Sequence, residues 1–149
     1  MNRDFVEMLS ALSEACVEFL VVGAHAMAAH GVPRATGDLD LWVRASAENA
    51  GRVLRALERF GAPLFDLTAG DLASSGTVFQ IGQPPNRIDI LTSISGVAFD
   101  DAWRNRMTIE AGGLRIPVLG KEDFIRNKRA VGRPRDLSDL EMLAESEGD

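Results

Sequence analysis

Two aspartates alternate with apolar residues along residues 38–43. Side chains two positions apart on a β-strand point to the same face, so Asp38 and Asp40 would lie side by side while Leu39 and Leu41 face the core. Strands rarely carry aspartate, and neighbouring like charges repel each other. The segment therefore predicts a strand with one buried face and two carboxylates that need a positive partner.

The rest of the 149-residue chain interleaves amphipathic helices with short apolar strands. Helical periodicity and capping residues, among them Asn2 and Ser46, predict helices over residues 4–17, 24–30, 46–60, 99–104, 121–131 and 136–144. Apolar or alternating runs predict strands over residues 19–22, 38–43, 77–81, 87–91, 107–111 and 114–118, the last two joined by a glycine hairpin turn. This order predicts an α+β fold, a mixed β-sheet flanked by helices, in one domain spanning residues 1–149 with a frayed acidic tail at 145–149.

Charge and composition exclude several classes of function. The formal net charge of −6 and the pI of about 4.9 argue against a general nucleic-acid coat or a polybasic membrane binder. A single cysteine, Cys16, excludes an internal disulfide, and its spacing from the apolar residues of the first predicted helix puts it on the buried stripe. The charged N-terminus is no signal peptide, and the longest apolar run, residues 19–32, is too short to span a bilayer. A cytoplasmic protein without a membrane partner is expected.

A third acid, Asp89, alternates with Ile88 and Ile90 in the predicted strand 87–91. If this strand lies beside strand 38–43, three carboxylates cluster at one place. Hard oxygen ligands with open coordination positions are typical of a magnesium site shared with substrate phosphates. The alternative is that these acids are solvent-facing strand residues, with Arg87 pairing with one of them.

A glycine turn follows the buried strand at residues 19–22 and precedes a predicted helix. Such a turn presents backbone N–H groups and a helix N-terminus to a phosphate. The small side chain of Ala24 keeps that approach open. The turn lies about 15 residues before the paired aspartates, which makes it more informative than a strand and a glycine alone.

Together these segments resemble the nucleotidyltransferase superfamily with a polymerase-beta-like catalytic core, most closely its small stand-alone bacterial and archaeal members such as the AbiEii-type toxins. The residues that carry the resemblance are Gly23, Ala24, Arg34, Thr36, Asp38, Asp40 and Asp89. A basic helix followed by an Asp-x-x-Asp-Leu segment, residues 136–140, also fits. The resemblance spans roughly residues 18–143 and implies the polymerase-beta-like nucleotidyltransferase fold in minimal form.

The resemblance implies a magnesium- or manganese-dependent transfer of a nucleoside monophosphate from a nucleoside triphosphate to a hydroxyl, in some relatives within a toxin–antitoxin system. Asp38, Asp40 and Asp89 would hold the metal, and Asp89 would help to activate the hydroxyl. The nucleotide would be contacted by Gly23, Ala24, Arg34, Thr36 and Lys128. The acceptor stays open between transfer RNA, a protein and a small molecule.

Ala24 departs from the family pattern, because many active relatives carry a serine there. An alternative is therefore a catalytically weak or inactive module that binds a nucleotide or a partner protein, as an antitoxin would. So small a core is also compatible with a homodimer or a cognate partner protein. A third alternative is a structural domain whose acids are solvated.

The segment 121–135 is locally basic in an acidic chain, with six basic residues against two acidic ones. It is interpreted either as a basic wall facing a triphosphate or RNA backbone, or as a solvated amphipathic helix. Asp136 and Asp139 are expected to bond to this basic segment rather than to a metal. Arg34 and Thr36 are likewise open between a phosphate contact and a solvated loop.

Overall fold

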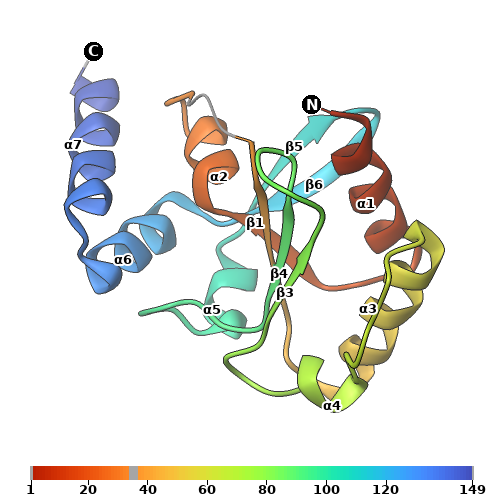
Figure 1. Cartoon of the computed structure of the whole chain (residues 1–149). Helices are drawn as coiled ribbons and strands as arrows, with labels where there is room; N and C mark the ends of the chain where they lie inside the picture. Colours follow the sequence, from red (N-terminus) through yellow and green to blue (C-terminus); the bar gives the residue numbers. More distant parts are fainter. Residues whose placement is uncertain (1, 34–36, 149) are drawn as a thin grey trace.

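A six-stranded mixed sheet runs through the part of the chain that the computed structural model describes, residues 2–33 and 37–148 (Figure 1). The strands are β1 (Phe19–Val22), β2 (Leu39–Val43), β3 (Val78–Ile81), β4 (Ile88–Leu91), β5 (Met107–Ala111) and β6 (Leu114–Val118). Their order across the sheet is β3-β4-β2-β1-β6-β5. The β1/β6 and β2/β4 pairs are parallel and the other neighbours antiparallel, which confirms the predicted α+β class with a mixed sheet.

The helices cover both faces of this sheet. They are α1 (Arg3–Glu14), α2 (Gly23–Ala29), α3 (Ala47–Phe60), α4 (Ala69–Leu72), α5 (Phe99–Arg104), α6 (Lys121–Val131) and α7 (Pro134–Gly148). Figure 1 shows α1, α3 and α4 on one side of the sheet and α2, α5 and α6 on the other, with α7 outermost. None of the helices in the described residues is both long and apolar enough to cross a membrane.

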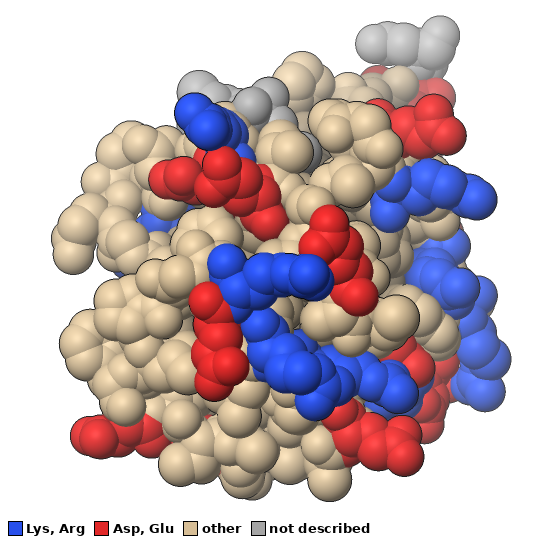
Figure 2. All heavy atoms as spheres, turned by 90° about the vertical axis from the view of Figure 1, so that its right-hand side faces the viewer, with Lys and Arg blue, Asp and Glu red and all other residues tan. Residues whose placement is uncertain are grey.

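Helices α1 and α3 start where their caps predict, and α3 also ends at the predicted residue. The Asn2 side chain accepts a hydrogen bond from the Phe5 N–H, and the Ser46 side chain caps α3, so each satisfies an otherwise unpaired helix donor. Gly61 ends α3 in the left-handed conformation that glycine adopts without strain. Figure 2 shows the side of the molecule that α1 and α3 cover, where basic and acidic side chains lie next to one another as on an ordinary solvated surface.

Three local predictions differ from the structure. Helix α1 ends at Glu14, and Cys16 adopts a φ of 58° and is exposed, because the chain turns there and leaves the buried stripe. Helix α4 was not predicted, although a Thr68–Asp71 capping box starts it. Helix α7 runs from Pro134 to Gly148, so it begins before and ends after the predicted range of residues 136–144.

Candidate functional site

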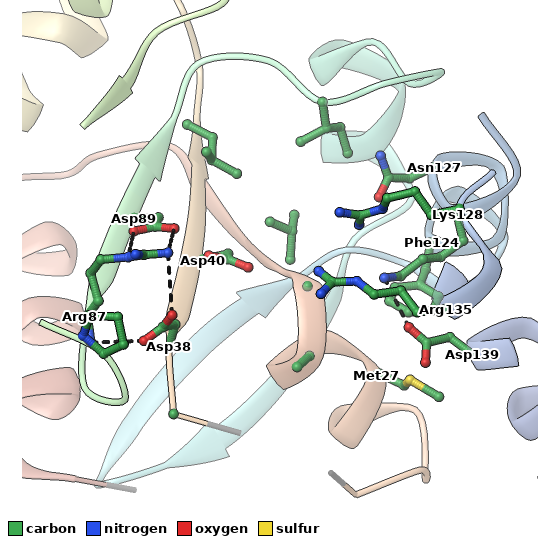
Figure 3. Close-up of a pocket in the computed structure, with 18 of the residues that line it drawn as sticks. Met27, Asp38, Asp40, Arg87, Asp89, Phe124, Asn127, Lys128, Arg135 and Asp139 are labelled. Carbon is green, nitrogen blue, oxygen red and sulfur yellow. Dashed lines mark hydrogen bonds and ion pairs between the residues drawn. The ribbon is translucent and has the colours of Figure 1, made fainter. Parts of the chain in front are cut away.

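A pocket of about 570 Å³ opens where β1 ends and where β2 and β4 begin. These strand ends coincide because β2 runs antiparallel to β1 and parallel to β4. One wall carries the acids of β2 and β4, and the opposite wall comes from α6 and the start of α7 (Figure 3). The turn between β1 and α2, with Gly23 and Ala24, lines the pocket between the two walls.

The acidic wall brings Asp38, Asp40 and Asp89 together. Parallel pairing of β2 with β4 places Asp40 directly opposite Asp89, so both side chains leave the same face of the sheet. Asp38 precedes β2 by one residue and accepts a hydrogen bond of 3.1 Å from the Arg87 backbone N–H. The apolar neighbours Leu39 and Ile90 are fully buried, so the strand core fixes the direction of the carboxylates.

Arg87 lies among these acids and pairs with two of them, Asp38 and Asp89. Its guanidinium donates to both carboxylate oxygens of Asp89, at 2.8 and 3.2 Å, and lies 3.4 Å from Asp38 Oδ2. Bidentate pairs of this kind are among the stronger protein hydrogen bonds. The interpretation that Arg87 pairs with the cluster is therefore confirmed.

Asp40 is the carboxylate of the three with which Arg87 forms no hydrogen bond or ion pair. Burial, and after it the negative charge of Asp89, raise the pKa of Asp40 to about 6, against 3.8 for an ordinary aspartate. Burial and nearby like charge both disfavour the ionised form. Asp40 therefore titrates close to neutral pH unless a further positive charge joins it.

A divalent cation fits this donor set. Carboxylate oxygens are the ligands that Mg²⁺ and Mn²⁺ prefer, and a cation beside Asp40 would offset the charge that raises its pKa. Within residues 2–33 and 37–148, no group of three or more Asp, Glu, His or Cys side chains is already arranged to hold a metal ion. Arg87 occupies part of that space, since it holds Asp89 and Asp38.

Gly23 is required by the packing of the turn against Asp40. Its φ of 68° is accessible to glycine at little cost, and a Cβ atom at this position would overlap the Asp40 carboxylate. Ala24 follows at the start of α2 and carries no hydroxyl toward the pocket. The turn thus approaches the acids closely and offers backbone groups only.

The basic wall includes Lys128, the residue expected to contact the nucleotide. Lys128 lines the pocket, but its side chain is only 12% exposed and its Nζ lies 3.0 Å from Asp136 and 3.1 Å from Asp139. Asp136 also accepts from Arg133, at 2.6 Å, so the expected bonding of these acids to the basic segment is confirmed. Lys128 is held within the protein by these contacts.

Arg135 is the basic residue that sequence reasoning did not single out. It lines the same pocket, is exposed, and makes no ion pair with any acid in the described part of the chain. Figure 3 shows its side chain on the wall opposite the three aspartates. Its place in the basic segment was visible in the sequence, but which basic side chain lacks an acidic partner was not.

Two predicted nucleotide contacts, Arg34 and Thr36, lie outside the described residues. The next residue, Gly37, does line the pocket, and a Cβ atom there would collide with the backbone of Pro85. Close packing of these two loops therefore places the chain just before Asp38 at the pocket rim.

Two solved structures share this fold over nearly the whole chain. A candidate nucleotidyltransferase from Thermotoga maritima aligns with a TM-score of 0.63 and 19% identity, over 96% of this chain and 91% of its own. An antigenic nucleotidyltransferase-like protein from Paracoccidioides brasiliensis aligns with a TM-score of 0.54 and 14% identity, over 96% and 74%. No protein-family model and no curated protein matches the sequence. The chain therefore has the α+β fold of nucleotidyltransferase-like structures, with an acidic and a basic wall facing each other across its pocket.

Proposed function

We propose that this protein is a divalent-cation-dependent nucleotidyltransferase that moves a nucleoside monophosphate from a nucleoside triphosphate to a hydroxyl. The observation that carries the proposal is the pocket in which Asp38, Asp40 and Asp89 face Arg135. Carboxylates that hold cations, opposite an arginine without an acidic partner, suit a polyphosphate that is bound at both ends. The fold shared with the Thermotoga maritima protein supports the same reaction class.

In this reaction the acceptor oxygen attacks the α-phosphorus, the bond from that phosphorus to the bridging oxygen breaks, and pyrophosphate leaves. A bound magnesium or manganese ion would stabilise the negative charge that gathers on the phosphoryl oxygens. Asp38, Asp40 and Asp89 would hold the ion, and Asp89 would also accept the proton of the hydroxyl. Arg135 would bind the outer phosphates, with backbone N–H groups of Gly23 and Ala24 along the middle of the chain.

The reaction is tested by incubating the protein with each of the four nucleoside triphosphates, with and without Mg²⁺ or Mn²⁺. Acceptors are transfer RNA, a protein mixture and small hydroxyl compounds, and the readouts are labelled product and pyrophosphate release. Asp38→Asn keeps the shape and the contact with the Arg87 N–H but removes a negative ligand, so we expect turnover to fall about 100-fold or more. Asp66→Asn changes an exposed aspartate outside the pocket and should leave turnover unchanged.

A second candidate is a module that binds a nucleotide without transferring it. The absence of a hydroxyl at Ala24 and the pairing of Arg87 with two of the acids favour it. Cation-dependent nucleotide binding with no product for any acceptor would support this alternative against the enzyme. Equal behaviour of the wild type and Asp38→Asn in binding and turnover would contradict both.

Arg135 and Arg129 form a matched pair for testing the basic wall. Both are exposed arginines of the same segment, but only Arg135 lines the pocket. A charge-assisted hydrogen bond contributes about 1.5–3 kcal/mol, so Arg135→Ala should weaken triphosphate binding about 10- to 100-fold. Arg129→Ala should leave the dissociation constant, measured by titration calorimetry, within about two-fold of wild type. Equal losses in the two variants would mean that only the general charge of the segment matters.

A further inference from the structure

Arg87 is placed where a bound cation would have to act. Its guanidinium contacts both oxygens of Asp89 and one oxygen of Asp38, and its backbone N–H contacts the other oxygen of Asp38. The arginine side chain is 27% exposed, so it borders the pocket and is not locked in the core. The same side chain thus contacts two of the three acids that a cation would use as ligands.

Asp40 does not share in this arrangement. Within the described residues, 2–33 and 37–148, no hydrogen bond or ion pair joins the Asp40 carboxylate to a basic side chain. Three carboxylates with one guanidinium leave the cluster with a formal surplus of negative charge. A cation that approached Asp40 alone would gain one ligand, whereas one that took all three acids would first have to displace Arg87.

We propose that Arg87 is a resident counter-ion that competes with the divalent cation for Asp38 and Asp89. The inference rests on the proposed function and adds a means of control to the same site: the cation binds weakly by itself and tightly only together with a triphosphate. A triphosphate supplies further oxygen ligands for the cation. It also offers the released guanidinium a new bidentate acceptor, which phosphate oxygens provide as readily as a carboxylate.

The test measures the affinity of Mn²⁺ for the protein without nucleotide, by electron paramagnetic resonance of free Mn²⁺, together with the melting temperature. Arg87→Gln removes the competitor, so we expect Mn²⁺ to bind about 10-fold more tightly than to wild type. The cation-free variant should melt at a lower temperature, because its acids repel one another, and Mn²⁺ should raise that temperature by more than in wild type.

Arg44→Gln is the matched control. Arg44 also pairs with two carboxylates, Glu18 and Asp100, but lies outside the pocket lining. Its replacement removes the same charge and a similar pair of contacts, so it should lower the melting temperature with no gain in Mn²⁺ affinity. A gain of equal size in Arg44→Gln would reduce the effect to net charge and overturn the inference.

The outcomes for Arg87 separate the inference from the proposed function. If wild type binds Mn²⁺ and folded Arg87→Gln binds it equally or less tightly, Arg87 is no competitor and the inference is wrong while the cation site stands. If neither binds Mn²⁺, with or without a triphosphate, both are wrong. If Arg87→Gln does not fold, Arg87→Lys replaces it. A single ammonium cannot hold both oxygens of Asp89 as the guanidinium does, so an increase in Mn²⁺ affinity is again expected. The absence of that increase would again contradict the inference.

Discussion

Asp40→Asn is expected to make the protein more stable at neutral pH and to abolish nucleotidyl transfer. The buried Asp40 carboxylate is ionised at neutral pH only at a cost, because burial and the charge of Asp89 raise its pKa to about 6. Asparagine has nearly the same shape and carries no charge. A residue that the isolated fold would be better without is typical of a functional site, where stability and activity oppose each other.

The sign of the pH dependence follows from the two protonation equilibria of Asp40. The folded protein holds the proton up to about pH 6, whereas the unfolded chain releases it near pH 3.8. Between these values the folded state binds more protons, so Asp40 makes the free energy of unfolding fall as the pH rises from about 4 to about 6. Above that range, the raised pKa of Asp40 lowers the free energy of unfolding by at most about 3 kcal/mol.

Urea denaturation at pH 4 and pH 8 measures this effect. We expect Asp40→Asn to match wild type at pH 4 and to exceed it by about 1–3 kcal/mol at pH 8 in the absence of divalent cations. Transfer activity should fall about 10³-fold or more, because a ligand worth several kcal/mol in the transition state is lost. The exposed Asp66→Asn is the control for both. A stability gain that is equal at the two pH values would contradict the assignment of the raised pKa to Asp40.

Asp136→Ala is expected to lower the free energy of unfolding more than the other substitutions proposed above, because it breaks a buried ion-pair network. The Asp136 side chain has no exposed surface and accepts from Lys128 Nζ and from both the side chain and backbone N–H of Arg133. Without it, Lys128 keeps a single acidic partner among the described residues, Asp139, in a place where its side chain is 12% exposed. Removing one partner of a buried pair leaves the other uncompensated, and typically costs about 3–5 kcal/mol.

The control is Asp101→Ala, which breaks the exposed ion pair with Arg104 and should cost less than about 1 kcal/mol. Chemical denaturation compares the two variants, and a similar small loss in both would show that the Asp136 network adds no stability. The bonds from Arg133, and after them those from Lys128, hold the pKa of Asp136 well below its usual range. The stability that Asp136 contributes is therefore present above pH 3.8 and is lost as the pH falls below it. Asp136→Ala should abolish this part of the pH dependence of the free energy of unfolding.

Local elements of this chain were predictable because each depends on residues close in sequence. The Ser46 cap and the Gly61 stop bound α3 as expected, and the glycine pair 112–113 turns the β5–β6 hairpin. Cys16 was misplaced because helical spacing does not show where a helix ends. Helix α7 extends past its predicted end at residue 144, because its last residues, Glu145 to Gly148, carry no apolar side chains from which helical periodicity could be read.

The sequence by itself determined that Asp38, Asp40 and Asp89 alternate with apolar residues, so their side chains point away from the apolar face of their strands. Only the tertiary structure decided that β2 and β4 are parallel neighbours, which sets Asp40 opposite Asp89. It also decided that Lys128 is held by acids of the next helix while Arg135 faces the pocket. The reason is that periodicity depends on a residue's own neighbours along the chain, whereas the partner of a charge depends on how separate elements pack.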